Sequence, residues 1–322
     1  MLFYTFIISA ILTIQPFGLE SASLRQPVDQ AAQPSTPPKV SDAFQPEVSQ
    51  LVASGLKLKE AVEASLDGAA DHLGAIFERA GAKEPSQRFE FRIFESDGQK
   101  SKTIFRRSDF FFTFANGSSK LNATDLNGDG LKEIIVQSSS GGNCWGCNPT
   151  EIYRVSNHKA ELIAAGPIQQ IVDLNKDGIA DLLMTDARWE SYDDLSHSAS
   201  PGAVMVYAWR NGKYVYASRD FPDYYQAAIA ELRNSIDQAK AEITADEFSD
   251  EAYVGRAIGL AITYAHAGEL ERGLKELETL LNSNAKTAAQ KKHRATILED
   301  FRSGESAKKL RAMKYGDELA LG

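Results

Sequence analysis

The sequence predicts an α+β protein in which a β-rich region, residues 86–220, lies between an N-terminal helix and a helical C-terminal region. Three observations support this prediction. Short apolar runs separated by turn residues fill the middle of the chain, and apolar residues recur every three to four positions on either side of it. In addition, one acidic nine-residue pattern occurs twice within the β-rich region.

The overall composition is that of an ordinary globular protein. The 322 residues are 43% hydrophobic and 25% charged, which is enough for two small domains. The net charge of −9 argues against nucleic acid and anionic membrane surfaces as partners. We therefore expect a protein or a glycan as the partner.

Residues 1–23 look like a secretory signal peptide. Residues 2–14 form an almost unbroken apolar run, followed by Pro16 and by small residues at 21–23. The run is shorter than the about 20 residues of a transmembrane helix, although no Lys or Arg precedes it. We expect a periplasmic or secreted protein without a transmembrane segment in the mature chain. An uncleaved anchor and a misassigned start are the alternatives.

Two segments precede the β-rich region. Residues 24–46 are rich in Gln, Pro, Ser and Ala and lack periodicity, which predicts a disordered linker. Residues 47–82 are predicted to form an amphipathic helix that ends near Gly81. Its apolar positions recur at three-to-four-residue spacing: Leu58, Val62, Leu66, Leu73, Ile76 and Phe77.

The strands of the β-rich region are predicted from alternating or short apolar runs. Residues 88–95 alternate apolar and charged side chains, which favours a hairpin strand with one exposed face. Asn211-Gly212 is a strong hairpin-turn signal. The other predicted strands are residues 103–107 with 110–114, 133–137, 150–155, 160–165, 169–172, 181–185, 203–210 and 213–218.

Two acidic loops share the pattern D-x-N-x-D-G-x-x-[D/E]. The first acidic loop spans residues 125–133 and the second spans residues 173–181. Oxygen-bearing side chains at positions 1, 3, 5 and 9, with glycine at position 6 for a sharp turn, suit calcium, which takes six to eight oxygen ligands. The predicted ligands are Asp125, Asn127, Asp129 and Glu133 in the first loop, and Asp173, Asn175, Asp177 and Asp181 in the second.

The residues after each loop exclude an EF-hand. An EF-hand has glutamate at position 12, where this chain has Val136 and Met184, and strand-like apolar runs follow both loops. With these features, residues 105–220 resemble the FG-GAP or VCBS repeat of integrin-type β-propellers, and the 48-residue separation of the loops fits four-stranded blades. The resemblance implies two blade-like antiparallel units that bind calcium, with the carbonyls of Leu131 and Ile179 as further ligands.

Each acidic loop also has a simpler interpretation. Turns rich in Asp, Asn and Gly form without any metal. If calcium binds, we expect it to fix a strand junction rather than to take part in catalysis, because all of its ligands lie within one loop.

Cys144 and Cys147 are the only cysteines of the chain. In an oxidising compartment this C-x-x-C pair predicts a small disulfide. A redox-active dithiol is the alternative, but such a pair normally lies at a helix N-terminus, whereas a predicted strand follows here. A zinc site would need two further ligands that no nearby Cys or paired His supplies.

One loop follows the metal-loop strand in each predicted unit. We expect the two loops to emerge on the same side and to bring Trp145, Trp189 and Tyr192 together as a ligand- or partner-binding surface. Alternatively, these aromatic side chains fold back over the sheet. The second loop also holds four acids: Asp186, Glu190, Asp193 and Asp194.

Residues 221–322 are predicted to be helical. Residues 257–281 resemble one tetratricopeptide repeat, with small residues at the crossing points and Tyr264, Gly268 and Leu277 at consensus spacing. One repeat is too short for a peptide-binding groove, so we expect a helical cap or docking surface. A solvated helix face is expected for the basic residues that follow: Lys291, Lys292, Arg294, Lys308, Lys309 and Arg311.

These observations predict an exported, calcium-binding, non-enzymatic binding or scaffold module. One alternative is an exported hydrolase that uses the acids of residues 186–194. The chain has no Ser-His-Asp elbow, His-rich metal centre or Gly-rich phosphate loop to support it. The other alternative is a thiol oxidoreductase acting through Cys144 and Cys147.

Overall fold

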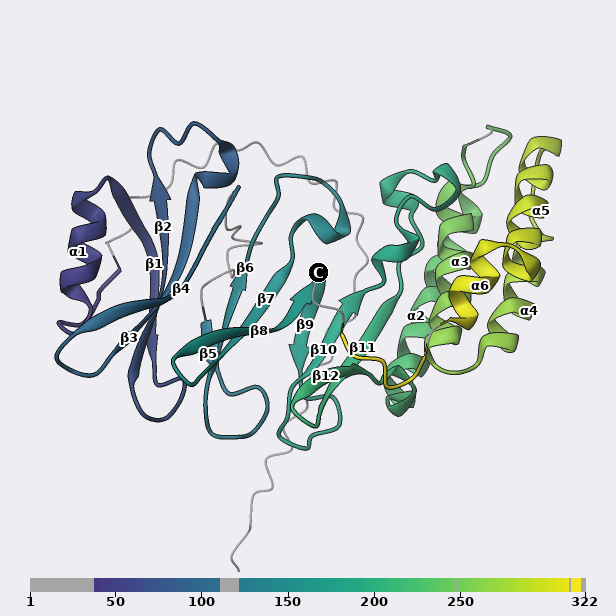
Figure 1. The fold of residues 1–322 in the computed structure, drawn as a ribbon. Helices are drawn as coiled ribbons and strands as arrows, with labels where there is room; N and C mark the ends of the chain where they lie inside the picture. Colours follow the sequence, from purple (N-terminus) through teal and green to yellow (C-terminus); the bar gives the residue numbers. More distant parts are fainter. Residues whose placement is uncertain (1–37, 111–121, 247, 313, 320–322) are drawn as a thin grey trace, which may run out of the picture. The chain divides into compact units, whose positions relative to one another are not determined.

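Three antiparallel sheets of four strands each follow one another along the chain (Figure 1). The computed structural model describes residues 38–110, 122–246, 248–312 and 314–319. These residues belong to one unit of the chain, residues 34–322. The predicted signal peptide, most of the predicted linker and the predicted strand residues 111–114 lie outside the described residues.

Each sheet is a meander in which strands that are consecutive in the sequence pair with one another. Sheet 1 contains β1 (Leu56–Ala64), β2 (Asp71–Arg79), β3 (Phe89–Ser96) and β4 (Ser101–Asp109). Sheet 2 contains β5 (Asn122–Thr124), β6 (Glu133–Gln137), β7 (Thr150–Ser156) and β8 (Lys159–Gly166). Sheet 3 contains β9 (Ile168–Val172), β10 (Asp181–Thr185), β11 (Val204–Arg210) and β12 (Lys213–Tyr216). The sequence predicted two such units, so the first sheet corrects that prediction.

The predicted helix over residues 47–82 is wrong. Only α1 (Gln45–Ala53) is helical, and Gly55, with φ of 96°, ends it before β1 begins. The Leu-Lys-Leu-Lys alternation at residues 56–59 is a strand pattern, and residues 72–77 form a continuous buried run within β2. Leu58, Val62 and Leu66 are four residues apart, a spacing that fits a helix but also fits the two-residue repeat of a strand. Pairing between β1 and β2 favours the strand.

The end of the predicted disordered linker is also ordered. Phe44 is fully buried beside Val48 of α1 and Phe77 and Phe94 of sheet 1. Its burial anchors α1 on this face of sheet 1. The region from residue 41 onward is therefore part of the folded structure.

Among the described residues, the predicted strands between residues 88 and 216 are confirmed to within a few residues. Both residues of the β7–β8 turn, Asn157 and His158, have positive φ, and so do both residues of the β11–β12 turn, Asn211 and Gly212. Two-residue turns of this kind match the right-handed twist of the strands that they join.

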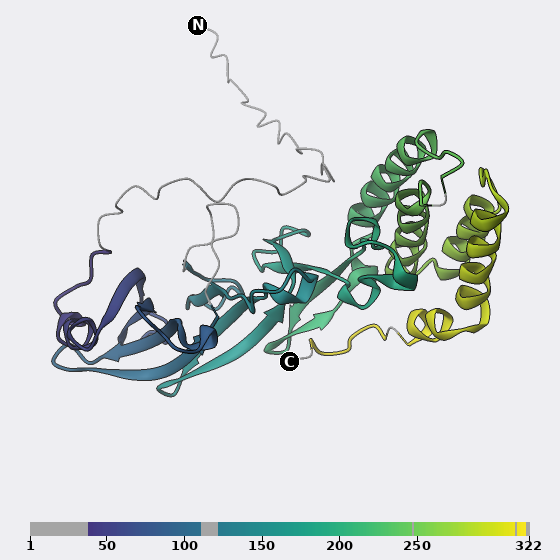
Figure 2. The ribbon, with the colours of Figure 1, turned by 90° about the horizontal axis from the view of Figure 1, so that it is seen from above.

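Successive sheets lie side by side (Figure 2), and clusters of buried apolar residues connect them. Phe91 of β3 lies with its ring centroid 5.6 Å from that of Tyr153 of β7, which joins sheets 1 and 2. Ile152 of β7, Leu182 of β10 and Tyr214 of β12 share a second buried cluster between sheets 2 and 3. The three sheets thus share continuous cores rather than forming separate domains.

The C-terminal region is helical, as predicted. Its helices are α2 (Pro222–Ala241), α3 (Glu251–His266), α4 (Leu270–Leu281), α5 (Ala288–Ser303) and α6 (Glu305–Arg311). Gly268, with φ of 86°, forms the turn between α3 and α4. A Cβ atom at Gly273 would lie 2.7 Å from Cβ of Tyr264, so a small residue is required where these two helices cross.

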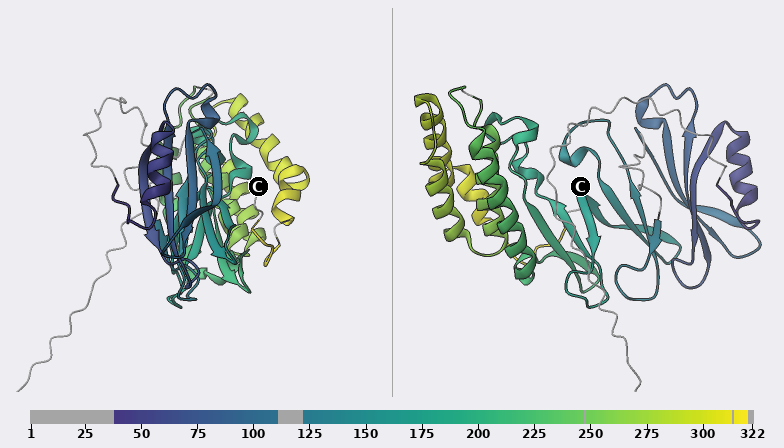
Figure 3. Two further views of the ribbon diagram at one scale, coloured as in Figure 1. Left: turned by 60° about the vertical axis from the view of Figure 1, so that its left-hand side comes forward. Right: turned by 180° about the vertical axis from the view of Figure 1, so that it is seen from behind.

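Helix α3 also contacts the loop that precedes β11 (Figure 3). Gly255 of α3 lies directly against the carbonyl of Ala199, and a Cβ atom at Gly259 would lie 2.8 Å from the carbonyl oxygen of Gly202. The helix therefore approaches the backbone of this loop without intervening side chains.

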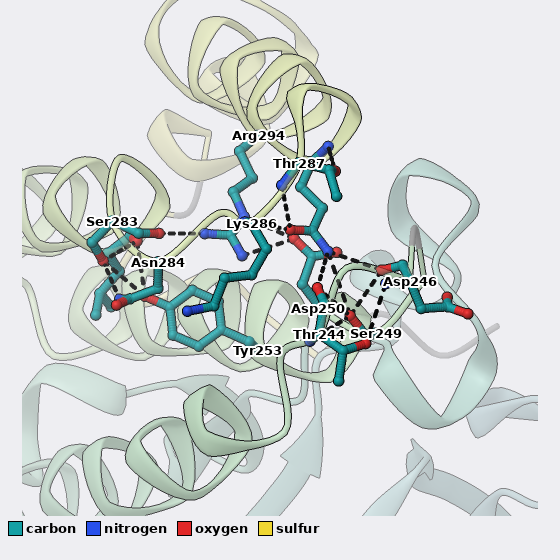
Figure 4. A network of polar contacts seen from close by, with 12 residues as sticks. Thr244, Asp246, Ser249, Asp250, Tyr253, Ser283, Asn284, Lys286, Thr287 and Arg294 are labelled. Carbon is teal, nitrogen blue, oxygen red and sulfur yellow. Dashed lines mark hydrogen bonds and ion pairs between the residues drawn. The ribbon is translucent and has the colours of Figure 1, made fainter.

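Arg294 is an exception to the expected basic surface. Its side chain is 1% exposed and pairs with Asp250 at 2.8 Å, and its guanidinium lies over the ring of Tyr253 (Figure 4). Gln290 of the same helix donates to the carbonyl of Asp246 at 2.9 Å. This network joins α5 to the segment before α3, so Arg294 has a structural role rather than a solvated one.

None of the helices in the described ranges is long and apolar enough to cross a membrane.

Candidate metal-binding loops

The first acidic loop lies between β5 and β6 and is held by its own side chains. Asp125, at position 1, accepts a hydrogen bond from the N–H of Gly130 at 2.9 Å. Asp129, at position 5, accepts from the N–H of Leu131 at 2.8 Å. Glu133, at position 9, accepts from the N–H of Leu126 at 2.9 Å. The pattern of acids therefore determines the fold of the loop.

The second acidic loop, between β9 and β10, repeats these contacts position by position. Asp173 accepts from the N–H of Gly178 at 2.8 Å, and Asp177 accepts from the N–H of Ile179 at 2.8 Å. Asp181 accepts from the N–H of Leu174 at 3.0 Å. At position 3, Asn127 and Asn175 each accept from the N–H two residues later.

The acids at position 9 are buried where the following strand begins. Burial, together with the charges of Asp129 and Asp125, raises the pKa of Glu133 to about 7, although the N–H of Leu126 opposes this shift. Burial, with the charges of Asp177 and Asp173, likewise raises the pKa of Asp181 to about 6, opposed by the N–H of Leu174. Burial and the neighbouring acids therefore disfavour the charged form of each position-9 carboxylate more than its hydrogen bond favours it.

The two loops contact one another. The N–H of Ala180 donates to the carbonyl of Leu126 at 2.7 Å. On the same side, a Cβ atom at Gly128 would lie 3.6 Å from the side chain of Ile179. Tyr214 lies close enough that burial and then the charges of Glu133 and Asp181 raise its pKa. The loops thus form one junction between sheets 2 and 3.

The donor set fits calcium by its chemistry. Each loop offers carboxylate and amide oxygens, and a carboxylate oxygen that accepts one N–H bond retains a lone pair for an ion. Within the described residues, neither loop brings three acidic ligand atoms to within 4.8 Å of one another. Calcium coordination would therefore require the acidic side chains of each loop to move closer together. The carbonyls of Leu131 and Ile179 remain predicted ligands.

Sheet 1 contains an equivalent loop that was not predicted from the sequence. Residues 63–71 read E-x-S-x-D-G-x-x-D and join β1 to β2, the same place that the acidic loops hold in sheets 2 and 3. Asp67 accepts from the N–H of Ala69 at 2.9 Å, as Asp129 and Asp177 do from the residue two positions later. Asp67 and Gly68 match positions 5 and 6 of the acidic pattern and could have indicated this loop. Glu63 and Ser65, however, occupy positions 1 and 3, where the pattern has Asp and Asn.

The loop after β6 contains the predicted disulfide. Cys144 and Cys147 are bonded, which confirms the prediction. The backbone N–H of Trp145, between them, donates to the carboxylate of Glu190 at 2.9 Å, and Glu190 also lies 3.0 Å from Nδ1 of His197. The loops after β6 and β10 therefore meet.

The predicted aromatic surface needs correction. Trp189 is fully buried: its ring stacks on that of Phe301, and Nε1 donates to Asp186 at 2.9 Å. Tyr192 is half-buried, and its hydroxyl donates to Asp300 at 2.8 Å. Both side chains pack against α5 and hold the loop after β10 there. Of the three aromatic residues, Trp145 is the one at the contact between the loops after β6 and β10.

The acids of residues 186–194 have separate partners. Asp186 is fully buried beside Arg188 and His266. Burial alone would raise its pKa, but the hydrogen bonds from Arg188 and His266 lower it. Asp193 pairs with His293 at 2.8 Å, and Glu190 binds the N–H of Trp145. Asp194 is exposed. The structure does not bring the four acids together as a catalytic set.

No protein-family model matches this chain, and no curated protein matches it.

Proposed function

We propose that this protein is a non-enzymatic binding or scaffold module for a protein or glycan partner, and that calcium at its two acidic loops fixes the junction of sheets 2 and 3. One observation carries the proposal. In both loops the side chains at positions 1, 3, 5 and 9 each accept a hydrogen bond from the equivalent backbone N–H, and the loops contact one another through Ala180 and Leu126.

The electrostatics of the loops support a cation. Glu133 and Asp181 are buried beside other acids of their own loops, and this placement raises the pKa of each. A divalent cation would replace this repulsion with attraction. Because calcium prefers oxygen ligands, the carboxylates and amides present suit it better than they suit a softer metal.

The arrangement of the remaining acids and of the disulfide argues for binding rather than catalysis. Asp186 has its oxygens satisfied by Arg188 and Trp189. The disulfide lies in a short turn, Trp145–Cys147, that leads into β7, rather than at the start of an α-helix that would lower a thiol pKa. These two arrangements favour a binding role over a hydrolase or a thiol oxidoreductase.

Calcium binding and chelation test the proposal. Purified protein should bind about two calcium ions, and excess chelator should lower its melting temperature, since an ion that binds only the folded state stabilises that state. Asp125→Asn combined with Asp173→Asn should remove both effects. Asp194→Asn, which changes an exposed acid outside the loops, is the matched control. Melting that chelator leaves unchanged would exclude the proposal.

A further inference from the structure

A second group of metal-ligating side chains lies at one end of sheet 1, separate from the acidic loops. Asp67 belongs to the β1–β2 loop, Glu95 to β3 and His158 to the β7–β8 turn. One ligand atom from each lies within 4.8 Å of the others, and no other group of three His, Cys, Asp or Glu in the described residues meets this condition. Elements of two sheets thus converge on one point.

His72, on β2, points into the same group. Its side chain is fully buried, and Nε2 has no hydrogen-bond partner. Nε2 lies 3.9 Å from Oδ2 of Asp67 and 3.7 Å from Oε2 of Glu95, too far for hydrogen bonds. A buried polar atom without a partner is destabilising, and coordination of a metal ion would give Nε2 a partner.

The other ring nitrogen of His72 has a partner of its own. Nδ1 accepts a long hydrogen bond, 3.4 Å, from the backbone N–H of Leu66. Coordination through Nε2 requires the tautomer that is protonated at Nδ1, so metal binding would replace this hydrogen bond.

Glu95 occupies the centre of the group. Its Oε2 lies 2.8 Å from Nδ1 of His158, and its Oε1 lies 3.1 Å from Nζ of Lys102. Asp67 is positioned by the N–H groups of Ala69 and Ala70, both bonded to Oδ1. Oδ2 of Asp67 and Oε2 of Glu95 are thus the oxygens that face the two imidazoles.

We propose that Asp67, His72, Glu95 and His158 bind a divalent transition-metal ion, with zinc as the best match. Two imidazole nitrogens and two carboxylate oxygens are a donor set that zinc accepts in tetrahedral geometry. Zinc bonds of about 2.1 Å place neighbouring ligands about 3.4 Å apart. Three of the six ligand-to-ligand distances are 2.8, 3.7 and 3.9 Å, on both sides of this value. The ligand atoms of Asp67, Glu95 and His158 all lie within 4.8 Å of one another.

The site has an entry path and a structural effect. A surface hollow lined by Ser41, Glu63, Asp71 and His72 opens beside it. Because His158 belongs to sheet 2 and the other three ligands to sheet 1, the ion joins the two sheets. The nitrogen ligands distinguish this site from the acidic loops, which offer only oxygen.

The test is metal titration of the full-length chain after chelator treatment, with cobalt as the spectroscopic probe and zinc as the competitor. We expect one ion with the visible absorption of four-coordinate cobalt, displaced by zinc and not by calcium. His158→Gln should weaken binding by more than about 100-fold, since even residues that only support a ligand contribute 10- to 100-fold. His158 is largely exposed, so this variant should fold.

His293→Gln is the matched control, because His293 is a partly exposed histidine 2.8 Å from a carboxylate and, among the residues that the structure describes, belongs to no group of three ligands. It should bind cobalt as the wild type does. Asp125→Asn with Asp173→Asn should remove calcium binding and leave cobalt binding intact, which separates this proposal from the function proposed above. Absence of cobalt and zinc binding, or binding that His158→Gln leaves unchanged, would overturn the site.

Discussion

The backbone N–H of Ala180 donates to the carbonyl of Leu126 across 2.7 Å, which places the second acidic loop directly against the first. Ions bound to the two loops would therefore act on one shared junction. Groups in contact usually show interaction free energies of about 0.5–3 kcal/mol, whereas distant groups act additively.

Coupling between the loops is the first prediction. Asp125→Asn should weaken calcium binding at the second loop, and Asp173→Asn should weaken it at the first, because each loop supports the backbone of the other. A double-mutant cycle on the melting temperature in calcium should give a non-zero interaction term. The control cycle pairs Asp125→Asn with Asp97→Asn, a turn acid of sheet 1 that binds the N–H groups of Gln99 and Lys100, and should be additive.

The pH dependence of the metal-free protein is the second prediction. The folded-state pKa of Glu133 is raised to about 7 from 4.5, so the folded state binds the proton more tightly than the unfolded state does. The stability contributed by protonated Glu133 should be present below about pH 4.5 and lost as the pH rises towards 7. Chemical denaturation in chelator should show this loss in the wild type relative to Glu133→Gln. A difference between the two proteins that is constant from pH 4.5 to 7 would contradict it.

Trp189 and Trp145 should differ in their contribution to stability. Trp189→Ala removes a fully buried ring stacked on Phe301, and such truncations cost about 3–5 kcal/mol in the free energy of unfolding. Trp145→Ala removes a partly exposed ring whose loop contact uses the backbone N–H, and should cost about 1 kcal/mol or less. Urea denaturation measures both, and equal losses would show that the assigned roles are wrong.

The disulfide should be a local constraint. Replacing both Cys144 and Cys147 with Ser opens a ring closed over a sequence separation of only three residues, so the chain-entropy model gives a loss of about 2 kcal/mol. Calcium stoichiometry should not change, and the wild-type protein should not reduce disulfides of a test substrate in the presence of a thiol reductant. Catalytic turnover that requires both cysteines would instead support the thiol oxidoreductase.

Local chemistry explains what the sequence could predict. The acidic loops, the Asn211-Gly212 turn and the disulfide each depend on residues close together in the chain, so their patterns can be read directly. The helical C-terminal region was also predictable, since its apolar residues recur with one clear period.

Long-range contacts explain what it could not predict. Trp189 is buried because Phe301 stacks on it, 112 residues later, and no local pattern around Trp189 indicates this partner. Glu95 and His158 are 63 residues apart and meet only because sheet 2 follows sheet 1. The residues of β1 satisfy both helix and strand periods, and pairing with β2 decides between them.

The close approach of Gly255 to the carbonyl of Ala199 has a consequence for protein engineering. The serine-rich segment 196–200 looks like a suitable place for an affinity tag or a fluorescent reporter, but helix α3 packs directly against its backbone at Ala199, and an insertion beside Ala199 would disrupt this contact. The exposed turn at Asn211 and Gly212 is the better insertion point, because nothing lies within 4 Å of a Cβ atom at Gly212.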